Sequence, residues 1–287
     1  MSMLGEAVLS GLVKMRPSAT PTHQSEGAGY RRYIARQYES SRGYFAKFPR
    51  FDVRGKSVLE IGCGTGGRAA YLATRGARRV VGADINANEI EIAKRLVSEL
   101  YPTTLGTLEF HVSRENEALD VGQFDVVVLA DVMEHVVSPA KMMRLAYNYT
   151  APGGTFFFSV LGFFHYAGSH IDLLPFANLL FSDETILNVV RAQVSRPDYV
   201  PDRFDSDPPI DRWRGLYDLR DRPGEHLNKI TLREIKKLVR YSPFQSSHMS
   251  VVGFGHKHPL LKLTDVLRRV PVLQEVYHSI VIVDCLK

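Results

Sequence analysis

Residues Val58–Gly67, with the sequence VLEIGCGTGG, decide the fold. The apolar run over Lys56–Ile61 is typical of a short buried strand, and the glycine loop after it leads into a helix that Gly76 ends. In such a loop, backbone N–H groups and the positive end of the helix dipole can approach a ligand closely, because no side chain intervenes. The glycines alone do not choose the ligand, since they also satisfy the G-x-G-x-x-G pattern of dinucleotide sites.

Further apolar runs follow this strand and alternate with helical patterns. The run over residues 124–130 is almost continuously apolar, as in the middle of a parallel sheet covered by helices on both faces. The alternation predicts an α/β fold with a doubly wound, mostly parallel, Rossmann-like sheet. Its seven strands are expected at residues 56–61, 79–83, 108–112, 124–130, 155–160, 246–252 and 279–284, with 246–252 a candidate partner of the last strand.

Helix starts are marked by capping residues. Asn86 or Asn88 can cap the helix after the second strand, and Ser138 followed by a proline opens another helix. Thr231 and Glu234 have the spacing of a capping box, which predicts a helix over 232–239. A further helix, dense in tyrosine and arginine, is expected before the first strand, at residues 30–45.

These elements divide the chain into four parts. Residues 1–29, rich in Ser, Thr, Pro and Gly toward their end, are expected to be a mobile lead-in, and residues 30–160 form the ligand-binding core. Residues 161–224 are irregular, aromatic and proline-rich, and they are long for a loop. We therefore expect a lid insertion after the fifth strand, with residues 225–287 completing the sheet.

Composition limits the classes of partner and location. The net charge of +5 allows an anionic partner, but the arginine-rich stretch over 203–222 also carries many aspartates, which is typical of a solvated face and disfavours nucleic acid. No apolar stretch is long enough to cross a membrane. The two cysteines lack ligand-like spacing, so a reducing compartment, the cytoplasm, is expected. The oligomeric state is left open, and a homodimer is compatible with the sequence.

Three features discriminate between ligands of the glycine loop. Glu60 stands just before the first glycine, where a carboxylate can face a cationic ligand and would repel a pyrophosphate. The other two are FDVVVLADVMEHVV over residues 124–137 and APGG over residues 151–154, directly before a strand. Asp84, at the end of the second strand, can accept from ribose hydroxyls in either kind of site.

Together with VLEIGCGTGG, these motifs resemble the class I S-adenosylmethionine-dependent methyltransferase superfamily over roughly residues 57–160. The resemblance implies that S-adenosylmethionine is the cofactor, that Asp84 holds its ribose and that Ile85 stacks on its adenine. Asp131, at the end of the fourth strand, would lie where such enzymes present the methyl group. The loop residues that would line the methionine moiety are Glu60, Gly62, Cys63, Gly64 and Gly66.

The DVMEH segment adds a candidate metal or base site. If the chain turns helical at Asp131, the spacing i, i+3, i+4 gathers Asp131, Glu134 and His135 on one face, where they can hold Mg²⁺. The pattern resembles metal-dependent O-methyltransferases of ubiquinone biosynthesis and of small-RNA 3′ ends, in which a later histidine joins the site, here His226. Two alternatives stay open: Asp131 as a helix cap with Glu134 in the first turn, and His135 as a metal-free general base.

The acceptor is less well marked than the donor. His165 and His170 follow the fifth strand, where either can act as base or bind a hydroxyl, or can be hydrogen-bonded within the lid. Candidate catalytic residues are thus His135, Asp131 and His165. We expect O-methylation of a small hydroxylated metabolite such as a sugar, phenol, quinone precursor or natural product. Alternatives are an RNA hydroxyl, N- or C-methylation, a nicotinamide oxidoreductase, and a binding protein of this fold without turnover.

Overall fold

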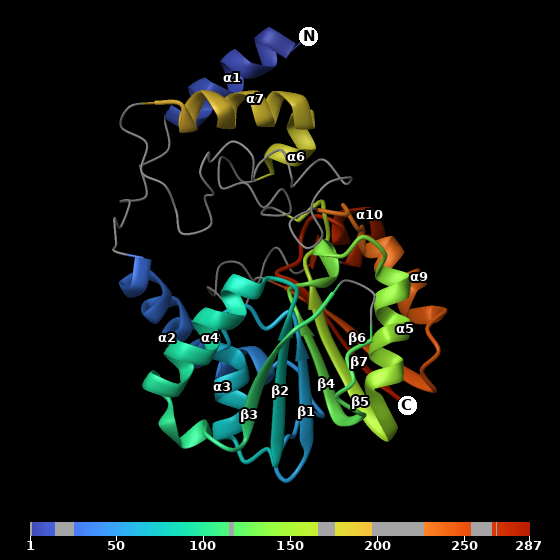
Figure 1. The fold of residues 1–287 in the computed structure, drawn as a ribbon. Helices are drawn as coiled ribbons and strands as arrows, with labels where there is room; N and C mark the ends of the chain where they lie inside the picture. The colour runs from blue at the N-terminus through green and yellow to red at the C-terminus, as the bar shows by residue number, and fades with distance from the viewer. Residues whose placement is uncertain are drawn as a thin grey trace.

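A seven-stranded sheet with the order β3-β2-β1-β4-β5-β7-β6 forms the centre of the computed structural model (Figure 1). The structure describes residues 2–14, 26–114, 118–165, 176–196, 227–253, 266–267 and 269–287. Strands β1 to β5 pair in parallel, whereas β7 is antiparallel to both β5 and β6. The predicted fold class and strand number are therefore confirmed. The strands are β1 Ser57–Ile61, β2 Arg79–Asp84, β3 Leu108–Val112, β4 Phe124–Ala130, β5 Thr150–Val160, β6 Ser246–Val252 and β7 Ile280–Leu286.

Helices cover both faces of this sheet (Figure 1). On one face lie α2 (Glu26–Phe45), α3 (Gly67–Thr74) and α4 (Ala87–Leu100), and on the other lie α5 (Pro139–Tyr149) and α9 (Leu232–Arg240). Successive strand residues point to opposite faces, so the central strands β1 and β4 are buried along nearly their whole length. In β1, for example, Val58 packs with the apolar side chains of α2 and α3, and Leu59 packs with those of α5 and α9.

The predicted helix caps are present. The Asn86 side chain accepts from the backbone N–H groups of the first turn of α4, and Ser138 caps α5 with a proline at the first helical position. Thr231 and Glu234 form the reciprocal capping box of α9. A 3₁₀ turn, η1 (Pro102–Thr104), precedes β3, and another, η2 (Met133–His135), follows β4.

Residues 2–14 of the expected lead-in form helix α1 (Ser2–Lys14), which the sequence pattern did not predict. Helix α1 packs along α7 (Asp183–Val194), and Leu9 is fully buried against Ile186 and its neighbours (Figure 1). The apolar face of α1 finds its partner almost two hundred residues further along the chain, so local composition could not reveal it. The described part of 161–224 contains α7 and the short helix α6 (Ala177–Leu180), and its role as a lid stays a prediction.

Two strand boundaries differ from expectation by more than one residue. β5 begins at Thr150 and not at residue 155, because the APGG segment forms an irregularity opposite β4 and bonds to Lys287 through Gly153 and Gly154. Gly154 is required there, since a Cβ would lie 3.0 Å from the backbone oxygen of Asp125. β7 extends to Leu286 and is preceded in the chain by the short helix α10 (Pro271–Gln274). No helix in the described ranges is long and apolar enough to cross a membrane.

Candidate functional site

A cavity of about 150 Å³ lies at the carboxyl ends of β1, β2 and β4. Strand order reverses at this point, because β1 has β2 on one side and β4 on the other. Open α/β sheets bind ligands at such a switch point. Five of the residues that line the cavity are Gly62, Asp84, Ile85, Val132 and His135. The structure thus brings together the glycine loop, the end of β2 and the turn after β4, as the sequence predicted.

The loop glycines serve two different purposes. Gly62, Gly64 and Gly66 all have positive φ, of 73°, 52° and 79°. A Cβ at Gly62 or Gly66 would come within 2.4 Å of a neighbouring side chain, so packing inside the protein excludes any other residue there. At Gly64 the nearest atom to such a Cβ is 3.8 Å away, on Glu89. Gly64 is therefore the position at which the missing side chain leaves room for a ligand.

The side chain of Cys63 donates to the backbone oxygen of Gly64 over 3.6 Å and does not line the cavity. Its side chain is buried beneath the loop, where a Cβ on Gly82 would lie 3.0 Å from the sulfur. Burial raises the pKa of the Cys63 thiol well above its usual range. The predicted contact between Cys63 and a ligand is consequently restricted to main-chain atoms. Both cysteines of the chain are free.

Asp84 connects the end of β2 to the glycine loop. Its carboxylate accepts a hydrogen bond of 2.8 Å from the N–H of Gly64 and one of 2.9 Å from the N–H of Asn86. Burial raises the pKa of Asp84, and these backbone hydrogen bonds oppose that rise. The two bonds hold the carboxylate at the cavity wall, next to Ile85, where it can accept from hydroxyl groups of a ligand.

Glu60 is a buried carboxylate near the carboxyl end of β1. Arg68 supplies a cation, with its Nη1 atom 3.6 Å from Oε1 of Glu60, and within the described residues neither carboxylate oxygen accepts a hydrogen bond. Burial raises the pKa of Glu60 to about 7, although Arg68 lowers it. A buried carboxyl group with so little compensation is suited to receive a further donor such as an ammonium group.

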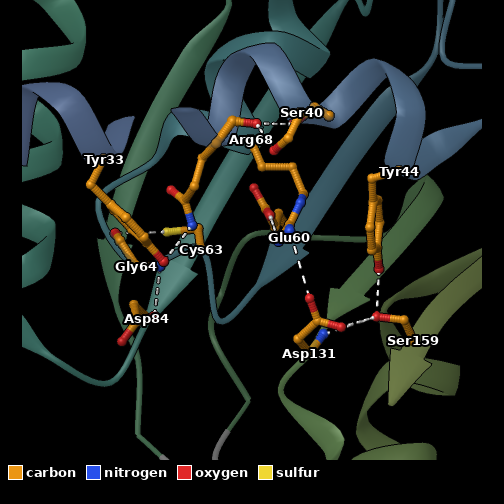
Figure 2. Close-up of polar contacts among 12 residues, drawn as sticks. Tyr33, Ser40, Tyr44, Glu60, Cys63, Gly64, Arg68, Asp84, Asp131 and Ser159 are labelled. Carbon is orange, nitrogen blue, oxygen red and sulfur yellow. Dashed lines mark hydrogen bonds and ion pairs between the residues drawn. The ribbon is translucent and has the colours of Figure 1, made fainter. Parts of the chain in front are cut away.

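Arg68 lies in the first turn of α3 and links three parts of the site (Figure 2). Besides Glu60, it faces the carboxylate of Asp131, at 3.9 Å from Nη2 to Oδ2. Its guanidinium lies 4.5 Å from the ring centre of Tyr44 of α2, a cation–π contact. The Nε atom of Arg68 is buried and has no hydrogen-bond partner among the described residues. Sequence reasoning missed both Arg68 and Tyr44, although the arginine directly follows the glycine loop.

Asp131 is the end of a hydrogen-bond chain that starts at Tyr44 (Figure 2). The buried Tyr44 hydroxyl donates to Oγ of Ser159 over 2.7 Å, and Ser159 donates to Oδ1 of Asp131 over 2.5 Å. The Asp131 N–H also donates to Ser159 Oγ, at 3.1 Å. Burial raises the pKa of Tyr44 above its usual value, so this hydroxyl stays protonated. The chain therefore orients the Asp131 carboxylate, whose side chain remains 42% exposed.

The helical turn at Asp131, which was the condition for gathering the three side chains on one face, does not form. Asp131 has a φ of 57°, outside the right-handed helical region, and only Met133–His135 form a 3₁₀ turn. Asp131 consequently points to Ser159 and Arg68, whereas His135 lines the cavity and Glu134 is buried. The geometric basis for a shared metal site on one helix face is lost.

Glu134 retains one property of a cation ligand. Burial raises its pKa to about 8, with a further contribution from Asp131. Its backbone oxygen accepts from the N–H of Asn228 at 2.9 Å, which fastens the turn to the segment before α9. In the part of the chain that the structure describes, no three His, Cys, Asp or Glu side chains are arranged to hold a metal. His226 lies outside the described residues.

His165 is buried and does not line the cavity. It is 2% exposed, and its ring centre lies 5.1 Å from that of His278, which is also buried. This position supports the interpretation of a packed histidine over that of a base near an acceptor. His170, the other candidate in this segment, lies outside the described residues.

The sheet order, the glycine loop at the switch point and the acidic residues ending β1 and β2 define a class I S-adenosylmethionine-dependent methyltransferase. The methyltransferase domain family matches residues 30–245, and the chain belongs to that family. The resemblance to the class I S-adenosylmethionine-dependent methyltransferase superfamily is thereby confirmed.

Individual relatives match a shorter region. A ubiquinone biosynthesis O-methyltransferase of Neisseria meningitidis is 38% identical over 112 residues, which cover 38% of this chain and 46% of that protein. One of Escherichia coli is 36% identical over 110 residues, 37% of this chain and 43% of that protein. The chain thus matches less than half the length of these relatives.

A solved structure extends the likeness over most of the chain. The S-adenosylmethionine-dependent methyltransferase of Mesorhizobium loti superposes with a TM-score of 0.51 at 17% identity, covering 88% of this chain and 97% of that one. At this identity the likeness shows the fold alone.

Proposed function

We propose that the chain transfers a methyl group from S-adenosylmethionine to a hydroxyl oxygen of a small metabolite. The observation that carries this proposal is the Asp131 carboxylate at the carboxyl end of β4. It is held by Ser159 and Arg68, yet it stays partly exposed. An oriented acceptor of this kind can take the proton of a substrate hydroxyl. The names of the relatives, O-methyltransferases, agree with an oxygen acceptor.

Each residue of the donor site has a proposed task. Glu60 receives the ammonium group of the donor, because its buried oxygens lack hydrogen bonds. Arg68 faces the carboxylate of the donor with its Nε atom, which has no hydrogen-bond partner among the described residues. Gly64, which has no side chain, leaves room for the aliphatic part of the donor's methionine moiety. Asp84 accepts from the ribose hydroxyls, and the adenine packs on Ile85.

The catalytic demand on the protein is small, because the bound donor supplies an already activated methyl group on a positively charged sulfur. The protein must align the acceptor oxygen with that group and accept its proton. In our proposal the proton goes to Oδ2 of Asp131, since Ser159 occupies Oδ1. His135, which lines the donor cavity, is the second candidate for this role.

The Mg²⁺ expected from the sequence stays a prediction. Asp131 does not fit a metal in the described geometry, because its carboxylate is engaged by Ser159 and Arg68. Glu134 fits better, since its buried carboxyl group has a raised pKa that a nearby cation would lower. The described residues do not supply three ligands, so no step above depends on a metal.

The test measures methyl transfer to a panel of phenols, quinone precursors, sugars and other hydroxylated metabolites, with mass spectrometry of the product. For an accepted substrate, Asp131→Asn is expected to lower kcat about 100-fold or more. Affinity for adenosylhomocysteine should change little, because that ligand needs no base. The matched control, Asp120→Asn, changes an exposed aspartate and should retain full activity. Products methylated only on nitrogen or carbon, or a fully active Asp131→Asn, would contradict the proposal.

A further inference from the structure

A second concave site lies between α5 and α9, which run side by side on one face of the sheet (Figure 1). This groove has a volume of about 720 Å³, and Met143, Ile230 and Leu238 give it an apolar lining. Two large apolar side chains border it and are exposed, Val137 at 52% and Tyr241 at 78%. The methyl-donor site uses none of these five residues, so the groove requires an explanation of its own.

The polar side chains of the groove are mostly engaged within the protein. The Asn228 amide donates to the backbone oxygens of Met133 and Val136 and accepts from the N–H of Ile230. Glu234 accepts from Thr231 in the capping box of α9. A small-molecule site normally offers a few convergent polar groups that orient the ligand. This groove offers apolar surface instead, which is better suited to a macromolecular partner.

Two cations at the groove are the exception. Arg144 of α5 and Lys237 of α9 line the groove and are exposed. Within the described ranges, neither side chain has an ion-pair or hydrogen-bond partner. Further cations lie on the same two helices, namely Lys141, Arg233, Lys236 and Arg240. The only acidic residue of these two helices is Glu234, which the capping box already engages. Arg144 and Lys237 therefore give the groove positive charge, and the one carboxylate of its lining, Glu234, is held in the capping box.

We propose that this groove binds an amphipathic helix of a partner protein, with apolar side chains on one face and acidic side chains beside them. A helix seats its apolar residues at i, i+3, i+4 and i+7 along such a channel. These residues would cover Val137, Leu238 and Tyr241, and the flanking acids would pair with Arg144 and Lys237. Charge complementarity selects an acidic partner and raises the rate of association.

Other macromolecules fit the groove less well. Nucleic acid is bound mainly through many phosphate contacts, whereas the groove itself presents only Arg144 and Lys237 beside an apolar lining. A membrane surface is matched by apolar residues that project from a protein, and here much of the apolar surface lies inside a concave channel. A helix fills a channel between two helices at the usual packing distance of 8–10 Å.

The experiment selects a displayed library of helical peptides of about 16 residues against the immobilised full-length chain. Peptides with the i, i+3, i+4, i+7 apolar pattern and acidic flanks should be enriched. Their affinity, measured by fluorescence anisotropy, should fall about tenfold or more for the double variant Arg144→Glu/Lys237→Glu. Tyr241→Ala should weaken the same peptides, because it removes exposed apolar contact surface. Surface changes of this kind should leave the melting temperature nearly unchanged.

The matched control is Arg95→Glu, which reverses an exposed arginine on α4, on the opposite face of the sheet. It should leave peptide affinity unchanged. Three results would overturn the proposal: no enrichment of acidic amphipathic sequences, equal loss of affinity in the control variant, or binding only to anionic vesicles or oligonucleotides. Self-association that Tyr241→Ala abolishes, without peptide binding, would also overturn it, because the occupant would then be a second copy of the chain.

Discussion

The hydrogen bond between Tyr44 and Ser159 allows a sharp test of the site geometry. Tyr44→Phe removes a buried hydroxyl that donates to Ser159 over 2.7 Å, and it retains the ring that packs on Arg68. Ser159 keeps the Asp131 N–H as a donor, so no buried acceptor is left without a partner. We expect a loss of about 1 kcal/mol in the free energy of unfolding, the usual net value of one hydrogen bond.

Ser159→Ala has a larger effect for a different reason. It leaves the Tyr44 hydroxyl buried without an acceptor, and it also removes the partner of the Asp131 carboxylate and N–H. An unsatisfied buried hydroxyl alone costs about 1–3 kcal/mol. In the Ser159→Ala background, Tyr44→Phe removes that unsatisfied group, so it should be neutral or stabilising. The coupling energy between the two substitutions is therefore expected to be about 1–3 kcal/mol.

The assay is urea unfolding at pH 7 of the wild type, both single variants and the double variant, with calorimetric melting as a second measurement. Each kcal/mol should move the melting temperature by roughly 2–4 °C in a chain of this size. If Tyr44→Phe has the same effect in both backgrounds, within about 0.5 kcal/mol, the hydrogen-bond chain to Asp131 does not exist as described. The reasoning on the orientation of Asp131 would then be refuted.

Three further predictions concern the donor site. Gly66→Ala should destabilise the fold by at least about 2 kcal/mol more than Gly106→Ala, because both glycines have positive φ but only Gly66 is closely packed. Gly64→Ala should mainly weaken the binding of adenosylhomocysteine, with a smaller effect on the free energy of unfolding. Calorimetric melting and binding titrations of all three variants check this. Burial raises the pKa of Glu60 to about 7, so the contribution of its protonated form to the free energy of unfolding is fully present below the unfolded pKa of 4.5 and is lost as pH rises through 7. Affinity for the ammonium group of adenosylhomocysteine should rise over the same pH range. Calorimetric titration of Glu60→Gln should show neither trend, and an unchanged pH dependence in that variant would contradict the assignment. If Mg²⁺ assists the reaction, EDTA should lower turnover at least about tenfold and added Mg²⁺ should restore it. Turnover of Glu134→Gln should change with neither EDTA nor Mg²⁺. Wild-type turnover that resists EDTA would remove the metal from the mechanism.

Local signals in the sequence were sufficient for most of the framework. The strands were predictable because each is a short apolar run, and the caps at Asn86, Ser138 and Thr231 were predictable because capping depends on a few adjacent residues. The positions of Glu60 and Asp84 also followed from sequence alone. Both lie at a strand end, and the ends of parallel strands meet at one edge of a sheet.

Predictions that required a backbone angle or a distant partner were less successful. The helical turn considered at Asp131 does not form, since this residue has a positive φ and its N–H donates to Ser159 on β5. Similarly, α1 was not recognised, since its apolar face is buried only by α7. No short-range pattern contains that information.

The sequence by itself thus determined the sheet, the glycine loop and the class of methyl donor, because these depend on residues close together in the chain. Only the tertiary structure decided how the proposed catalytic carboxylate is held. Tyr44 and Ser159 are 115 residues apart, and Arg68 lies between them in the sequence. Their contact with Asp131 arises from the packing of α2 and α3 over the ends of β4 and β5. The same packing of distant elements, α5 against α9, creates the groove that we assign to a partner helix.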